Sequence, residues 1–290
     1  MFGPLLAAFR RSPVAQLVEQ VAVNHRVAGS SPARGAKSLR ALLPNPAAFL
    51  ILAQTGAEPG LTIDWTTMPT YNTVMAVAAG AGLVMLVLFG REFLRDPGEV
   101  IPESWALAFG VVGAILAATG LHMTLTWPLA VSFPFDNIIF GEPSLAFGVL
   151  LLAAALYLWR HGPALLARDD GVARLARAGL PVSVFVVGMG LGMFGIAIAG
   201  VRYQLFAAPP EEPISGAFAA YPMVEAVFVS GLYALVGLGA VLFPAALRDV
   251  HRPSTARAVV GWTWGIAGVV FLLFGAMNFF THIGLIVNTM

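Results

Sequence analysis

Six long apolar stretches constrain the fold of this chain more than any other feature of its sequence. A helix needs about 20 apolar residues to cross the hydrocarbon core of a bilayer, and it satisfies its own backbone hydrogen bonds there. The stretches cover residues 73–90, 105–127, 143–159, 182–200, 222–243 and 261–282. The sequence therefore predicts an all-α membrane protein, a bundle of six transmembrane helices within residues 63–290.

The composition agrees with a membrane protein and excludes several functions. Charged residues make up 11% of the chain, whereas a soluble domain carries about a quarter. The formal net charge of +1 gives no electrostatic basis for binding nucleic acid. Because the chain has no cysteine, disulfides, thiolate metal sites and thiol catalysis are excluded. A metal ion or a haem would need histidine, methionine or carboxylate ligands.

Arginine is concentrated in three of the loops. The loops after the first, third and fifth stretches carry nine arginines, whereas the opposite loops carry only Arg202. Positively charged loops stay in the cytoplasm. We therefore predict that both termini lie outside (N-out/C-out) in a bacterial plasma membrane. The nine arginines are Arg91, Arg95, Arg160, Arg168, Arg174, Arg177, Arg248, Arg252 and Arg257.

Residues 1–60 differ in composition from the rest of the chain, and they contain its only lysine, Lys37. Residues 13–36, from Pro13 to Ala36, resemble the peptide that is produced when a transfer-RNA gene is read as coding sequence. This resemblance indicates a start codon placed too far upstream. We therefore expect residues 1–62 to be a non-native or disordered extension, and we assign no function to His25. The alternative is a natural disordered tail.

Glycines are spaced for close helix packing. Gly188 and Gly192, and also Gly261 and Gly265, form G-x-x-x-G pairs that allow two helix backbones to approach. Residues 190–195 also match the dinucleotide-binding pattern G-x-G-x-x-G. That pattern functions between a strand and a helix, whereas here it lies inside an apolar stretch. We interpret these glycines as packing positions.

One side of the predicted bundle carries the polar residues that suggest a function. The apolar loop 127–143 holds Asp136, Asn137 and Glu142. The other ionisable residues close to the membrane map to the same side, namely His122, Arg202, Glu225 and His282. Ionisable residues within a membrane usually face the bundle interior or a cavity, so this side is the candidate functional face.

The two histidines suggest a metal ion or a haem. His122 and His282 lie on different helices at a similar depth, which suits them to ligate a divalent metal or a haem iron. The alternative is that each imidazole only forms a hydrogen bond near the interface. Each histidine shares a helical face with other polar residues, which are Thr119 and Thr126 for His122 and Asn278 for His282.

Glu142 and Glu225 have a local explanation and a functional one. Glu142 directly precedes Pro143, and Glu225 follows Pro222 by three residues. Proline and acidic residues both favour the first turn of a helix, so we expect both glutamates at helix starts. The functional alternative is that the two carboxylates provide metal ligands or a proton relay.

The remaining polar residues of this face also have local explanations. Asp136 and Asn137 follow a proline-containing segment, and an Asx-type turn is their expected role. Arg202 opposes the charge bias of its side of the membrane. We expect it to form an ion pair with Glu142 or Glu225, because a guanidinium matches a carboxylate well. The alternatives are that it binds an anionic ligand or that it only extends toward the membrane interface.

Two motifs resemble a known family. Leu125-Thr-Trp-Pro-Leu129, followed by Phe135-Asp-Asn-Ile-Ile-Phe-Gly-Glu-Pro143, is similar to the membrane-protein family named domain of unknown function 981. The resemblance extends over residues 63–282 and implies an integral membrane protein with several helices. It implies no activity and no catalytic residues.

Three functional hypotheses follow. The first is a redox or metal-binding protein that uses His122 and His282. The second is a transporter whose small substrate enters beside the loop 128–141. The third is an accessory subunit whose glycine-rich faces pack against a second copy or a partner in a membrane complex. No motif indicates an enzymatic reaction. The lipid bilayer is the expected environment, and no nucleic acid is expected as a partner.

If residues 1–62 are not part of the natural protein, their deletion should leave expression and membrane insertion unchanged. The measurement compares the full chain with a chain that begins at Ile63, by membrane fractionation. Loss of insertion in the shortened chain would contradict the prediction.

The predicted orientation can be tested with single cysteines, because the chain has none. Ser132→Cys and Ser215→Cys should react with an impermeant thiol reagent in intact cells, whereas Ser254→Cys should react only after lysis. The reverse labelling pattern would show that the orientation is inverted.

Overall fold

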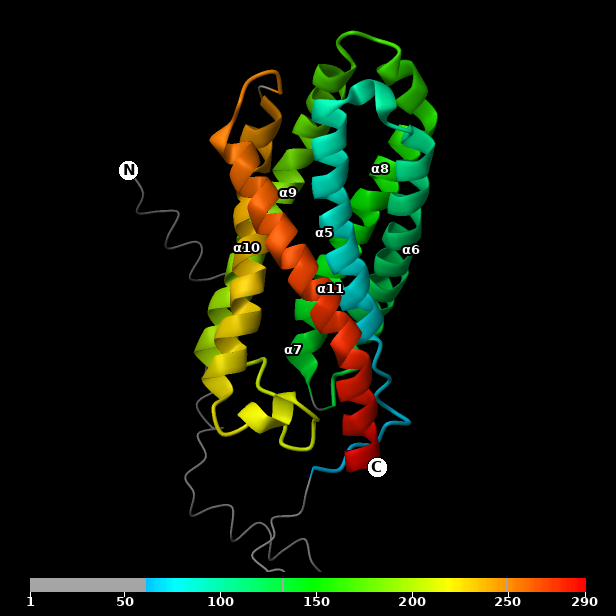
Figure 1. Ribbon diagram of the computed structural model, residues 1–290. Coiled ribbons are helices and arrows are strands. Elements are labelled where there is room, and N and C mark those ends of the chain that lie inside the picture. Colours follow the sequence, from blue (N-terminus) through cyan, green and yellow to red (C-terminus); the bar gives the residue numbers. More distant parts are fainter. Residues whose placement is uncertain (1–60, 132, 249) are drawn as a thin grey trace, which may run out of the picture. The chain divides into compact units, whose positions relative to one another are not determined.

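The computed structural model describes residues 61–131, 133–248 and 250–290 (Figure 1). The expectations for residues 1–60, including the extension and His25, lie outside these described residues. Within the described ranges the chain forms helices and no strand. The six long helices are α5 (Asn72–Arg95), α6 (Pro102–Thr126), α8 (Glu142–Leu166), α9 (Gly171–Tyr203), α10 (Pro222–Arg248) and α11 (Thr255–Thr289). The four short ones are η1 (Pro97–Glu99), α7 (Pro134–Asp136), η2 (Asn137–Gly141) and η3 (Ser215–Phe218).

The described part contains six helices that are long and apolar enough to cross a membrane. This confirms the predicted all-α class and the six transmembrane helices. The helices continue beyond the apolar stretches of the sequence, and α9 and α11 reach 33 and 35 residues. Hydropathy falls where polar residues begin, but backbone hydrogen bonding continues through such residues, so hydropathy alone underestimates the length of these helices.

The loops lie at two ends of the helices (Figure 1). The loops after α5, α8 and α10 lie at one end, which we call the arginine end because it carries nine arginines. Residues 61–71, α7, residues 204–221 and the end of α11 lie at the opposite end. We call this the acidic end, because Asp136, Glu142, Glu212 and Glu225 lie there with Arg202. Which end faces the cytoplasm stays a prediction.

Hydrogen bonds join separate segments at the acidic end. The Ile63 amide donates to the Thr289 carbonyl oxygen at 3.1 Å, and Trp65 Nε1 donates to Thr289 Oγ1 at 3.0 Å. Asn288 Nδ2 donates to the Glu211 carbonyl oxygen at 2.7 Å. The segment before α5 and the loop 204–221 are therefore both attached to the end of α11.

The structure changes one position of the labelling experiment. Ser215 is buried in η3, so a cysteine there would not react well with a thiol reagent. Ala217 lies in the same short helix and is exposed. Ala217→Cys is therefore the better reporter for this loop.

The six helices associate as three close pairs, α6 with α8, α9 with α10, and α5 with α11. Glycines at the crossings bring the backbones together. A Cβ atom on Gly120 of α6 would lie 2.3 Å from the Leu145 nitrogen of α8, and one on Gly80 of α5 would lie 2.3 Å from the Leu272 nitrogen of α11. A Cβ atom on Gly237 of α10 would lie 2.8 Å from the carbonyl oxygen of α9 residue Gly190. No other residue type fits at such distances.

The glycine pairs predicted from the G-x-x-x-G spacing are wrong as contacts within the described chain. A Cβ atom on Gly188, Gly192, Gly261 or Gly265 would meet nothing within 4 Å. The spacing shows that two small residues share a helix face, but it does not show which face meets a neighbour. Gly190, on another face of α9, makes the contact with α10 instead. The pattern of residues 190–195 lies inside α9, so it is not a strand-to-helix phosphate loop.

Helix α8 starts differently from the prediction. The sequence predicts a helix that starts at Pro143, whereas a continuous helical segment runs from Pro134 through α7, η2 and α8. Proline has no N–H to donate to the carbonyl four residues earlier, and its ring crowds that carbonyl. The π-helical turn η2 directly before Pro143 accommodates this defect. The Ile139 carbonyl, which Pro143 leaves without its usual donor, accepts a hydrogen bond at 3.1 Å from the Tyr233 hydroxyl of α10.

The contrast between paired and unpaired glycines predicts a contrast in stability. Gly148 of α8 lies against the α6 backbone, where a Cβ atom would approach the Ala117 nitrogen to 2.3 Å, whereas Gly188 of α9 has open space. Gly148→Leu should lower the thermal stability of the purified protein, because overpacking costs about 1–3 kcal/mol. Gly188→Leu is the matched control and should leave the midpoint close to that of the wild type. Equal midpoints for the two variants would contradict the pairing of α6 with α8.

Candidate functional site

A cavity of about 1520 Å³ lies between the helix pairs. Because α8 packs on α6 and α9 packs on α10, the consecutive helices α8 and α9 have little contact with each other. Residues of α5, α8, α9, α10 and α11 line the space that remains. The cavity is larger than the ~300–1,000 Å³ of most small-molecule pockets. The α9 residues that line it run from Val172 to Met193, a distance of about 32 Å along the helix.

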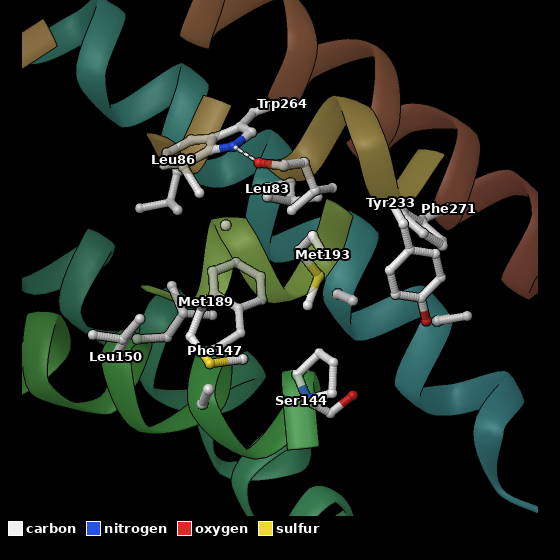
Figure 2. A pocket seen from close by; sticks show the side chains of 18 of the residues that line it. Leu83, Leu86, Ser144, Phe147, Leu150, Met189, Met193, Tyr233, Trp264 and Phe271 are labelled. Atoms are coloured by element: carbon white, nitrogen blue, oxygen red, sulfur yellow. Dashed lines mark hydrogen bonds between the residues drawn. The ribbon is translucent and has the colours of Figure 1, made fainter. Parts of the chain in front are cut away.

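The middle of the cavity is apolar. Figure 2 shows Phe147 and Leu150 of α8 together with Met189 and Met193 of α9 around the same space. Trp264 of α11 also lines it, and its only polar side-chain atom, Nε1, donates to the Val236 carbonyl oxygen at 3.1 Å. An apolar lining favours apolar molecules over water, and methionine side chains adapt to ligands of different shape.

The cavity becomes polar toward the acidic end, where Asp136, Glu225, Asn278 and His282 line it. Glu225 Oε2 accepts a hydrogen bond from the Ala208 amide at 2.7 Å. His282 Nδ1 lies 2.9 Å from the Asn278 carbonyl oxygen. A carbonyl can only accept, so Nδ1 carries the proton and Nε2 of the neutral ring is an acceptor.

Aromatic rings line the cavity between the apolar middle and these polar groups. The Tyr233 ring stacks on Phe206, with the two ring centroids 5.8 Å apart. Phe271 meets the Tyr233 ring edge-on at 6.0 Å. All three rings line the cavity. Because the Tyr233 hydroxyl is bonded to the Ile139 carbonyl, the position of its ring is fixed between α10 and η2.

Only some of the predicted residues come together at this site. Of His122, Glu142, Arg202, Glu225 and His282, the cavity is lined by Glu225 and His282. Glu142 and Arg202 are exposed and do not line the cavity. Glu225 lies in the first turn of α10, as expected for an acidic residue at a helix start.

The ion pair expected for Arg202 is not formed with any described residue. The four ion pairs found in the described ranges involve Arg95, Arg168, Arg174 and Arg177 at the arginine end. The Arg202 guanidinium instead lies over the ring of Tyr203, with Cζ 5.5 Å from the ring centroid. At the end of a span an arginine can turn toward the interface, which removes the need for a carboxylate partner.

His122 is exposed and uses its ring in a local network. Its Nδ1 lies 2.5 Å from the Tyr71 hydroxyl, and its Nε2 lies 3.4 Å from Thr126 Oγ1. Burial raises the pKa of Tyr71, so its hydroxyl stays protonated, and the tautomer of the His122 ring decides which of the two groups donates. Thr119 hydrogen-bonds to the Ile115 carbonyl of its own helix. Both nitrogens of the His122 ring are therefore already occupied.

Asn137 has a structural role. It is buried, its Oδ1 accepts from the Leu129 amide at 3.1 Å, and its Nδ2 donates to the Pro134 carbonyl oxygen at 3.1 Å. These bonds attach the loop after α6 to the start of the next helix. The neighbouring residue Asp136 lines the cavity, so two adjacent polar residues have different roles.

The described residues provide no ready metal centre. In residues 61–131, 133–248 and 250–290, no three histidine, aspartate or glutamate side chains are grouped so that they could hold a metal ion. His122 does not line the cavity that His282 lines. A divalent metal or a haem ligated by His122 and His282, with Glu142 or Glu225, stays a prediction that this arrangement does not favour.

Sequence reasoning missed the apolar part of the site. Phe147, Leu150, Met189, Met193 and Trp264 lie in helices that are apolar on all faces. Periodicity therefore carries no signal for the side that faces a cavity. The sequence does contain one indication of this part of the site. Met189 and Met193 are spaced by four residues, so they lie on one face of α9.

Comparisons with known proteins agree with this architecture. No curated protein and no solved structure matches the chain. The family described as "Protein of unknown function (DUF981)" matches residues 68–284, which include all six long helices except the last residues of α11. The chain is therefore a polytopic membrane protein that belongs to the DUF981 family.

Proposed function

We propose that this protein binds a long amphipathic molecule inside the membrane, with its apolar chain between α8 and α9. The observation that carries the proposal is the cavity itself, which is apolar along its middle and polar toward the acidic end. Its length of about 32 Å along α9 is close to the thickness of the hydrocarbon core of a bilayer. A lipid-like molecule matches both the length and this polarity.

The separation of α8 and α9 supports access from the bilayer. Each of these helices is held by its partner, α6 or α10, and not by the other. A molecule dissolved in lipid can therefore reach the cavity sideways without crossing a polar surface. Substrates that come from water would have to leave their hydration shell for an apolar space, which is costly for polar groups.

This proposal is a specific form of the transporter hypothesis. A water-soluble small substrate would need a hydrated path, whereas the middle of this cavity is formed by side chains such as Phe147 and Met193. The accessory-subunit hypothesis is supported by the exposed small residues Gly188 and Gly192 on α9, but they identify no partner. Binding of a hydrophobic chain is the function that the geometry favours most directly.

The proposal predicts that filling the cavity weakens binding. Leu150→Trp and Met189→Trp add volume to opposite walls of the cavity. Each should reduce binding about tenfold, because overpacking costs about 1–3 kcal/mol and 1.4 kcal/mol corresponds to a factor of ten. Binding is measured in nanodiscs as light-induced labelling by hexadecanol with a diazirine in its chain, followed by mass spectrometry of the labelled peptides.

The controls introduce the same residue on the outer faces of the same helices. Leu156 of α8 is 59% exposed and Leu191 of α9 is 60% exposed, and neither lines the cavity. Leu156→Trp and Leu191→Trp should leave labelling of the cavity peptides unchanged. Labelling confined to outer faces, or an equal loss in all four variants, would show that the cavity is not the binding site.

A further inference from the structure

The acidic end of the cavity carries carboxylates that no cationic side chain of the described residues neutralises. Asp136, Glu212 and Glu225 contribute carboxylates, and no lysine or arginine of the described residues lines this end. The Glu225 carboxylate accepts hydrogen bonds from the Ala208 amide and the Ser215 hydroxyl, whereas no hydrogen bond or ion pair to the Asp136 carboxylate occurs in the described part of the chain. An unpaired carboxylate beside an apolar space is costly, and a cationic ligand group would remove that cost.

Asn278 gives a second, independent indication. It is 8% exposed, it lines the cavity, and its Oδ1 is buried without a hydrogen-bond partner. A buried acceptor without a donor costs about 1–3 kcal/mol. The imidazole of His282 lies beside it, with Nδ1 held by the Asn278 carbonyl. A hydrogen-bond donor on a ligand would satisfy the Asn278 side-chain oxygen.

The aromatic rings beside these acceptors narrow the chemistry further. Phe206, Tyr233 and Phe271 line the cavity close to its polar end, and the Tyr233 hydroxyl is already used in a bond to Ile139. Their ring faces are electron-rich and attract cations such as ammonium groups. A hydroxyl head group could satisfy the acceptors, but it would gain little from the rings and from the three carboxylates.

We propose that the acidic end of the cavity is a site for the ammonium head group of a long-chain amphiphile. In this arrangement Asp136 and Glu225 pair with the charge, Asn278 Oδ1 accepts an N–H, and the alkyl chain extends between α8 and α9. The inference rests on the proposed function, because it assigns the head group of the molecule proposed above. A free alkylamine and an amine-bearing phospholipid share this chemistry.

The arginine end of the cavity is the alternative place for a head group, which would then be anionic. Arg91, Arg95 and Arg257 line the cavity there; Arg95 pairs with Asp96 at 3.2 Å, and Arg257 donates to the Arg252 carbonyl oxygen. Arg91 is exposed at the helix surface. No buried unpartnered polar atom of the described residues lies at that end, whereas Asn278 provides one at the acidic end. The observations therefore favour an ammonium at the acidic end over an anion at the arginine end.

The test uses three diazirine probes with the same chain and different heads, namely hexadecylamine, hexadecanol and hexadecanoic acid. They are applied to the full-length protein in nanodiscs, and labelling of the cavity peptides is measured by mass spectrometry. Asp136→Asn and Glu225→Gln, singly and together, remove two of the three carboxylate charges with little change in shape, and Asn278→Leu removes the acceptor. Glu142→Gln is the matched control, because Glu142 is an exposed acid of the same helical segment as Asp136 and does not line the cavity.

We expect the double variant to lower amine labelling about tenfold, the size expected for a charged hydrogen bond. Alcohol labelling should stay the same, which also shows that the variant is folded. Glu142→Gln should change neither the amine labelling nor the alcohol labelling. For each probe, labelling of the variant is divided by labelling of the wild type, so differences in how well the probes enter the bilayer cancel.

Several results would overturn the inference while leaving the proposed function intact. One is that the double variant lowers labelling by all three probes equally. Another is that Glu142→Gln lowers amine labelling as much as the double variant does. A third is that the acid labels the cavity peptides and that Arg91→Gln abolishes this labelling. Failure of the proposed function looks different, because then no probe labels the cavity peptides and Leu150→Trp changes nothing.

Competition separates the two sources of the ammonium group. Displacement of the amine by phosphatidylethanolamine, but not by phosphatidylglycerol, assigns the site to a lipid head group, and no displacement assigns it to a free alkylamine.

Discussion

The close approach of helix backbones at glycine residues is the interaction on which the rest of this structure depends. Apolar burial does not drive helix association in lipid, so packing of small residues has to hold helices together. Gly120 and Gly148 hold α6 against α8, Gly80 holds α5 against α11, and Gly190 meets Gly237 between α9 and α10. Each helix therefore has one preferred partner. The space between the pairs, rather than a groove on the surface, becomes the cavity.

The second constraint is that a backbone carbonyl inside a membrane needs a donor. Pro143 withdraws the usual donor of Ile139, and the Tyr233 hydroxyl of α10 replaces it. The same bond fixes the Tyr233 ring, which stacks on Phe206 and meets Phe271 at the polar end of the cavity. A defect in one helix thus sets the aromatic wall of the candidate site. Because Tyr233 lies next to Asp136, charge, aromatic faces and apolar surface occur together at this end of the cavity.

The sequence was sufficient for the helical class and for the six spans, because hydropathy reports directly on the length of apolar sequence that a bilayer requires. It was not sufficient for the contacts. The spacing of Gly188 and Gly192 was correctly seen as a shared face, yet that face is exposed and Gly190 makes the contact. Glu225, His282, Asp136 and Asn278 were identified as candidates and line one cavity, whereas His122 and Arg202 lie outside it. Helices that are apolar on all sides carry no signal for rotation about their axes, so which polar residues converge depends on the packing of the pairs.

The most direct test of this account is a structure of the protein in lipid nanodiscs, determined by electron cryomicroscopy. The account predicts α8 and α9 held apart, with elongated density of a bound molecule beside Phe147 and Met193. The polar end of that density should lie next to Asp136, Glu225 and Asn278. Direct packing of α8 on α9, with no space between them, would contradict the central claim.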